Sequence, residues 1–169
     1  MMKTPLFTPS HVANFILTQA ECEGVPVTQL KLLKLVYLLY GWVRAIRDER
    51  LFDEDIQAWR LGPVIPSLYH EFKRFGSDPI TERSLCMDDD GKITVPSISG
   101  NSPVEMVMRK AWDVYKPFTA SALVNKTHEP DSPWAKHYDS SSIHETIPDA
   151  EIQEYFFRKI SEYVRAPTP

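Results

Sequence analysis

Apolar side chains occupy almost every position between residues 30 and 43 and would cover nearly all sides of a helix. Thr28 is placed to cap that helix, and the charged residues that follow predict its end by Arg47. Because a helix that is apolar all around must be covered by other elements, this segment predicts a buried central helix. The run is too short to cross a bilayer and is interrupted by Lys31 and Lys34, so we expect no membrane contact.

Leu33, Val36 and Leu39 are expected to be fully buried in this helix. Each such burial contributes about 1.5–3 kcal/mol to the stability of the fold. Gly41 lowers the helix propensity of the same segment by up to about 1 kcal/mol. Its presence therefore indicates either a close crossing with another helix or a kink.

Further helices are predicted where apolar residues recur at helical spacing after a capping or proline signal. Their expected starts are Thr8-Pro9, Ile65, Ser102-Pro103, Thr119, Ser132-Pro133 and Pro148-Asp149. Gly24 and Gly76 are placed to end two of these helices. The pattern as a whole predicts a mainly α fold, a compact helical domain built around one buried central helix.

One hairpin signal accompanies the helices, which makes the predicted fold α+β in a minor way. Ser84–Met87 and Lys92–Val95 flank Asp88–Gly91, and an Asp-Gly pair favours a tight turn. A lone hairpin is marginal in water. We therefore expect this hairpin to pack on the helices, or to gain the extended segment Gln57–Leu61 in a three-stranded sheet.

The segment from Ile56 to Tyr69 predicts a rigid change of direction. Its alternating residues are extended, and Gly62-Pro63 then disfavours both a continuing strand and a helix. Pro66 suits the first turn of the next helix. The sequence thus predicts a sharp corner at Gly62-Pro63 that fixes the directions of Trp59 and Tyr69. Such a corner serves the fold alone or carries a partner-binding surface, and the two roles are compatible.

The length, charge and cysteine content of the chain make some classes of protein less probable than others. The 169 residues, 43% of them hydrophobic, predict one domain over residues 1–169 with flexible ends at 1–7 and 166–169. The net charge of −4 argues against nucleic acid as a partner. Cys22 and Cys86 form no CxxC pattern, which argues against a disulfide scaffold or a cysteine zinc site. With no signal-peptide pattern at the N-terminus, we expect a cytoplasmic protein.

No pattern typical of an enzyme is present. The pair His128-Glu129 resembles the opening of a zinc helix, but the second histidine of HExxH is replaced by Ser132. There is no glycine-rich phosphate loop and no GxSxG elbow. We therefore predict no catalytic residues, no cofactor and no metal, and keep a hydrolase using His128 and Glu129 as an alternative hypothesis.

Two segments, taken in order, resemble a known family. The first contains Gln29–Tyr37, Trp42, Leu51-Phe52, Ile56–Trp59, Gly62–Pro66 and Leu68-Tyr69, and the second contains Ala122-Leu123, Thr127–Glu129, Pro133-Trp134, Ile152 and Tyr155-Phe156. Together they resemble the SocA-like, phage-associated antitoxins with a Panacea domain. An Ala-Trp-x-x-Gly-Pro-Val segment followed downstream by Thr-His-Glu and Pro-Trp is a specific combination, and the likeness extends from about residue 8 to residue 157.

The resemblance implies an antitoxin that neutralises a cognate toxin by direct protein contact. One relative in this family instead delivers its toxin to a ClpXP-type protease, so a proteolytic adaptor is one alternative. A DNA-binding regulator using the helices over 28–47 and 66–74 is another, although the acidic charge and the apolar central helix disfavour it. The sequence leaves the oligomeric state open.

The candidate partner-binding residues come from both halves of the resemblance. They are Trp59, Gly62, Pro63, Val64, Tyr69, His128, Glu129 and Trp134. We hypothesise that the two groups meet in space and form a rigid patch, although about sixty residues separate them in sequence. The alternative is a structural role, in which Thr127 and Glu129 satisfy backbone groups while His128 packs against Trp134.

Overall fold

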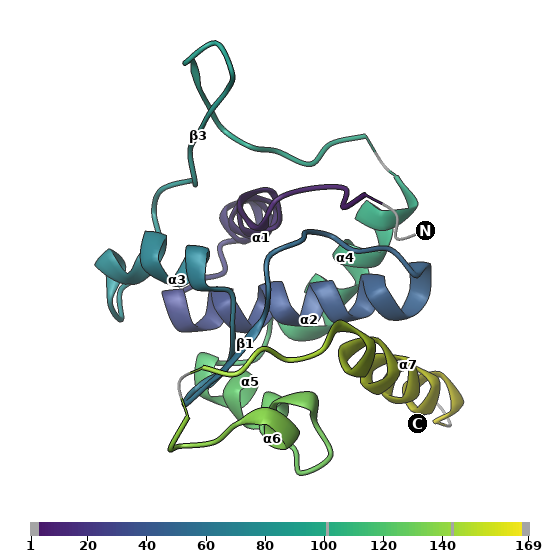
Figure 1. Ribbon diagram of the computed structural model, residues 1–169. Coiled ribbons are helices and arrows are strands. Elements are labelled where there is room, and N and C mark those ends of the chain that lie inside the picture. Colours follow the sequence, from purple (N-terminus) through teal and green to yellow (C-terminus); the bar gives the residue numbers. More distant parts are fainter. Residues whose placement is uncertain (1–3, 101, 143, 167–169) are drawn as a thin grey trace.

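One helix, α2 (Gln29–Arg47), runs through the middle of the molecule (Figure 1). The computed structural model describes residues 4–100, 102–142 and 144–166. Thr28 Oγ1 accepts a hydrogen bond from the Lys31 N–H and caps the helix, as predicted. All residues from 31 to 44 are buried, which confirms that this helix is the central one.

Six other helices are described, and five of them contact α2. They are α1 (Pro9–Glu23), α3 (Pro66–Phe72, continued by a 3₁₀ turn Lys73–Phe75), α4 (Pro103–Tyr115), α5 (Ala120–Thr127), α6 (Pro133–His137) and α7 (Asp149–Arg165). Ser102, Thr119 and Ser132 each accept a backbone N–H from the third residue after them, which confirms the predicted caps. The helix contacting α2 least is α6, which instead packs on α7.

Gly41 marks the crossing of α2 and α7. A Cβ at this position would lie 2.2 Å from two ring carbons of Phe156. The absent side chain thus lets the aromatic ring approach the α2 backbone directly, so the close crossing is the correct one of the two predicted explanations. At the start of α7, both carboxylate oxygens of Asp149 accept hydrogen bonds from Arg44 Nε.

In the ranges that the structure describes, the strands form two separate hairpins, so the expected three-stranded sheet is wrong. β1 (Gln57–Trp59) pairs antiparallel with β2 (Gly62–Val64), and β3 (Cys86–Met87) pairs with β4 (Ile93–Thr94). The predicted corner at Gly62-Pro63 is also wrong, because both residues lie inside β2 and the chain reverses at Arg60-Leu61. Pairing with β1 keeps Gly62 and Pro63 within a strand, and such pairing cannot be predicted from local sequence preferences.

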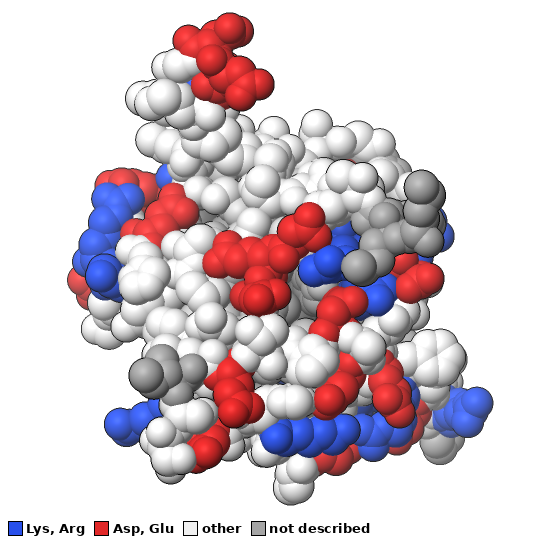
Figure 2. Space-filling view, in the orientation of Figure 1, with Lys and Arg blue, Asp and Glu red and all other residues white. Residues whose placement is uncertain are grey.

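The β3–β4 hairpin projects from the body instead of packing on the helices (Figure 1). Its large apolar side chains, Leu85, Met87, Ile93 and Val95, are 52–70% exposed, and Figure 2 shows acidic side chains at its tip. Within the described residues, contacts of α1 with Ser84 and Pro96 fix the base of the hairpin. There the buried Asn14 amide of α1 bonds to the N–H and C=O of Ser84 and to the carbonyl of Pro96, at 2.8–3.0 Å.

The ends of the chain are only partly within the described residues. Residues 1–3 and 167–169, which belong to the expected flexible ends, lie outside them. The N–H groups of Leu6 and Phe7 donate to the carbonyls of Arg50 and Leu51. Among the helices in the described ranges, none combines the length and apolar character that a bilayer span requires.

Candidate functional site

The β1–β2 hairpin points a backbone carbonyl, that of Pro63, toward α2. Ala58 lies opposite Pro63, and the Ala58 N–H donates to the Glu145 carbonyl at 2.8 Å, away from β2. At such a non-hydrogen-bonded pair the backbone groups of both residues point outward, so proline loses no ladder bond there. The outward carbonyl of Pro63 accepts a hydrogen bond of 2.7 Å from Lys34 Nζ.

Lys34 is a fully buried lysine, with 0% of its surface exposed. Burial lowers the pKa of its ammonium group to about 7. Within the described ranges it forms no ion pair with a carboxylate, and an isolated buried charge is costly. Burial therefore disfavours the charged form of the Lys34 amine, and either form can donate to the Pro63 carbonyl.

Gly62 allows the hairpin to approach both α2 and α5. Its φ of +103° is in a region that residues with a Cβ rarely adopt. A Cβ on Gly62 would lie 2.7 Å from Thr127 Oγ1 and 2.9 Å from Lys34 Nζ. Thr127 itself donates to the Val124 carbonyl at 2.8 Å, so it satisfies a backbone group as predicted. Glycine is thus required by both space and conformation.

The two candidate segments meet through a tryptophan. Trp134 Nε1–H donates a 2.7 Å hydrogen bond to the carbonyl of Trp59. The His128 ring stacks on the Trp134 ring, with the two centroids 3.6 Å apart and an interplanar angle of 3°. Trp59 in turn contacts the ring of Tyr69 at 4.7 Å. The hypothesis that these segments are neighbours in space is therefore confirmed.

We call these residues, together with Tyr138, the aromatic patch: Trp59, Tyr69, His128, Trp134 and Tyr138. The Tyr138 ring stacks on Trp134 at 4.8 Å and 14°. All five side chains are half-buried, so each retains surface for a partner. Gly62, Pro63 and Val64 are buried and cannot touch a partner directly. Their part in the site is to position Trp59.

The surroundings of His128 favour its neutral form. Burial and the nearby charge of Lys34 both lower the pKa of its imidazole. Its Nε2 is buried and has no hydrogen-bond partner within the part of the chain that the structure describes. The stacking against Trp134 is the contact that the structural alternative predicted.

Glu129 faces a different region from its neighbour His128. Glu129 Oε2 accepts hydrogen bonds from Tyr155 OH at 3.0 Å and from Lys159 Nζ at 2.6 Å. The expectation that Glu129 satisfies backbone groups is wrong, because α7 supplies side-chain partners that the sequence did not reveal. His128 and Glu129 have separate partners, so the geometry gives no acid–base pair for the hydrolase hypothesis. In the described ranges, no three His, Cys, Asp or Glu side chains are placed to hold a metal.

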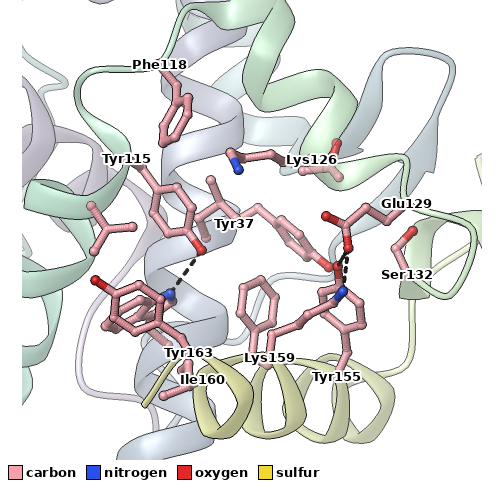
Figure 3. Close-up of a pocket in the computed structure, with 15 residues that line it drawn as sticks. Tyr37, Tyr115, Phe118, Lys126, Glu129, Ser132, Tyr155, Lys159, Ile160 and Tyr163 are labelled. Carbon is pink, nitrogen blue, oxygen red and sulfur yellow. Dashed lines mark hydrogen bonds and ion pairs between the residues drawn. The ribbon is translucent and has the colours of Figure 1, made fainter. Parts of the chain in front are cut away.

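A cavity of about 390 Å³ opens where α2, α4, α5 and α7 meet (Figure 3). Seven of its fifteen lining residues are aromatic. Figure 3 shows Glu129 beside Tyr155 and Lys159 at one side, while Lys126 extends from α5 into the cavity. Thr127, Glu129 and Ser132 line the cavity and belong to the same stretch of chain as His128 and Trp134. The segment over residues 127–134 thus contributes side chains both to the cavity and to the aromatic patch.

Sequence reasoning missed this cavity and the role of Lys34. The residues that line the cavity are spread from position 37 to position 163. In the sequence, each of its aromatic residues by itself indicates only an ordinary core position. For Lys34 a signal did exist, since it is one of two lysines, with Lys31, that interrupt a helix that is otherwise apolar on nearly all sides.

Comparison with known proteins identifies the family. Residues 32–135, more than half of the chain, match the family described as antitoxin SocA-like, Panacea domain. The chain belongs to this family. The resemblance noted from the residues is thereby confirmed, and the matched region of the Panacea domain contains the β1–β2 hairpin and the segment from His128 to Trp134.

A curated relative supports the assignment. Antitoxin SocA of Caulobacter vibrioides (strain NA1000 / CB15N) is 27% identical over 124 residues. The alignment covers 73% of this chain and 66% of the relative, just under two thirds of that protein's length. No solved structure matches the chain.

Proposed function

We propose that this member of the SocA-like family is an antitoxin that neutralises a cognate toxin by binding it directly. Family membership supports the antitoxin role. The observation that carries the binding proposal is the 2.7 Å hydrogen bond from Trp134 Nε1 to the Trp59 carbonyl. That bond joins the two family segments into one surface before any partner arrives.

The aromatic patch has the properties of a binding surface. Tryptophan and tyrosine are enriched among the residues that dominate binding energy at interfaces. Stacking fixes His128 and Trp134 in the free protein, so their side chains would lose little conformational entropy on binding. Leu61, at the nearby β1–β2 turn, adds an apolar side chain that is 50% exposed.

Co-expression with the product of the adjacent gene, tested as the toxin, tests this proposal. Tyr69→Ala and His128→Ala are scored for rescue of growth, for capture of the toxin in a pull-down and for melting temperature. We expect both variants to fold and to lose neutralisation. Met106→Ala, which removes a 59% exposed side chain from α4, is the matched control and should behave as wild type. Full neutralisation by both patch variants would refute the assignment of this surface.

The same cells separate inhibition from delivery to a protease. Direct inhibition leaves the amount of toxin unchanged while growth is restored, whereas an adaptor lowers the toxin level on immunoblots only when a ClpXP-type protease is present. The DNA-binding alternative is weakened because residues 31–44 of α2 are buried and cannot enter a groove of DNA.

A further inference from the structure

The cavity beside the aromatic patch is large enough to receive a side chain from outside. Protein interiors are closely packed and contain few voids larger than a water molecule. A volume of about 390 Å³ falls instead in the range of ligand sites, roughly 300–1,000 Å³. Its aromatic walls include Trp42, Tyr115 and Phe118, whose ring faces and edges suit contact with another ring.

Among the charged side chains that the structure describes around the cavity, Lys126 has no carboxylate partner. The Glu129 carboxylate is matched by Lys159 Nζ at 2.6 Å, so this pair contributes no net charge. Lys126 Nζ lies 4.4 Å from the centroid of the Phe118 ring, and no carboxylate among the described residues pairs with it. An anionic group entering the cavity would therefore meet an available ammonium.

Hydrogen-bond donors favour the same kind of ligand. Trp42 Nε1–H donates to Tyr115 OH at 3.2 Å, so the Tyr115 oxygen acts as acceptor in that bond. The Tyr115 hydroxyl hydrogen is then available to donate elsewhere. Together with the three N–H groups of Lys126, it presents donors to a carboxylate.

We propose that the cavity receives an aromatic side chain of the cognate toxin, and that a carboxylate next to that ring on the toxin pairs with Lys126. This inference rests on the proposed function. The toxin is the expected source of the ring because one chain segment supplies both features: Ser132 lines the cavity, and Trp134, two residues later, belongs to the aromatic patch. One partner can therefore occupy both.

The first experiment tests the chemistry of the cavity without the toxin. N-acetyl-tryptophan and its uncharged analogue N-acetyl-tryptophanamide are titrated into the full chain and followed by calorimetry and NMR. We expect the carboxylate to bind on the order of fivefold tighter than the amide, as for a good exposed ion pair. Lys126→Gln should abolish that preference, whereas Lys110→Gln, at an exposed position of α4 outside the cavity, should retain it. Equal binding of the two probes, or no binding, would overturn the proposal.

The second experiment tests whether the toxin is the occupant. Ile160→Phe places a ring at the cavity wall, and Val164→Phe, on the same helix at a 75% exposed position, is its control. We expect Ile160→Phe to reduce toxin capture at least about tenfold, as the loss of an interface anchor does. Excess N-acetyl-tryptophan should compete with the toxin for wild-type protein. If Ile160→Phe fails to fold, toxin capture by Lys126→Gln tests the proposal instead. We expect Lys126→Gln to capture the toxin more weakly than the wild type does.

The outcomes separate the two proposals. If folded Ile160→Phe and Lys126→Gln capture the toxin as well as the wild type does, the cavity assignment is overturned. The proposal of direct toxin binding then still stands. A probe that binds the cavity but does not compete with the toxin identifies a free small aromatic anion as the ligand, and also overturns the proposal. Failure of wild-type protein to capture the toxin contradicts the proposed function itself.

Discussion

At the residue scale, Lys34 departs furthest from the ordinary behaviour of its type. Lysine is almost never fully buried unless it is paired, yet Lys34 is enclosed in α2 with the Pro63 carbonyl as its hydrogen-bond acceptor. The interaction requires a carbonyl that points away from its own hairpin, which depends on the pairing of Ala58 with Pro63. A sequence pattern shows the lysine but not the carbonyl, so its role could not be predicted.

The lowered pKa of Lys34 predicts a pH-dependent stability. Its pKa is about 7 in the folded protein and 10.5 as the reference for the unfolded chain, so between these values the unfolded state holds more protons. Stability then rises with pH across this window. Relative to Lys34→Met, the wild type should gain up to about 1.4 kcal/mol of unfolding free energy per pH unit between pH 7 and 9.5.

Chemical denaturation of both proteins over that range measures the gain. Lys110→Met, which removes an exposed lysine, controls for the loss of one positive charge. If the unfolding free energies of wild type and Lys34→Met run parallel with pH, Lys34 is charged in the folded protein throughout and the interpretation is wrong.

Gly62 and Gly24 provide a matched pair of glycine substitutions. Both have positive φ, at +103° and +66°, but a Cβ at Gly24 meets nothing within 4 Å. Gly24→Ala should therefore show only the conformational cost, about 1–2 kcal/mol. Gly62→Ala adds the clash with Thr127 and Lys34, so its melting temperature should fall clearly further. Equal losses would show that Thr127 and Lys34 move aside at little cost.

At the scale of elements, helix starts were predictable and strand positions were not. The caps at Thr28, Ser102 and Thr119 act on residues three positions away, so the sequence contains both partners. Which residues pair between two strands depends on the rest of the fold, so the pairing is not contained in the local sequence. The hairpin over residues 84–95 was recognised from its turn, but its projection from the body was not, because that depends on Asn14 of α1.

The crossing of α2 and α7 predicts an unusual response to Gly41→Ala. In an ordinary helix this change adds up to about 1 kcal/mol of stability through helix propensity. Here the new Cβ would occupy the space of the Phe156 ring, and such overpacking costs about 1–3 kcal/mol. The variant should therefore lower the free energy of unfolding. Adding Phe156→Leu should restore part of the loss, so that the double-mutant cycle shows favourable coupling.

At the scale of the whole molecule, the described elements share one core whose centre is α2. The family could be inferred from motifs along the chain, and most of those motifs lie within residues 32–135, the region that matches the family. The cavity could not be predicted, since α4, α5 and α7 approach it from separate parts of the chain and each supplies only one wall. Of the partner-binding residues proposed from sequence, Gly62, Pro63 and Val64 turned out to be buried supports.

The dependence of the whole fold on α2 predicts a sharp contrast between two substitutions on that helix. Leu39 is 0% exposed and Ile46 is 46% exposed. Leu39→Asp would bury a carboxylate with no partner, at a cost of several kcal/mol. Because the total stability of a domain is only about 5–15 kcal/mol, circular dichroism should show Leu39→Asp largely unfolded at 25 °C. Ile46→Asp keeps its charge in water near the helix end and should cost only about 1 kcal/mol or less. A cooperative melting transition near that of wild type in Leu39→Asp would contradict the central position of α2, since it would mean that the face carrying Leu39 is open to solvent.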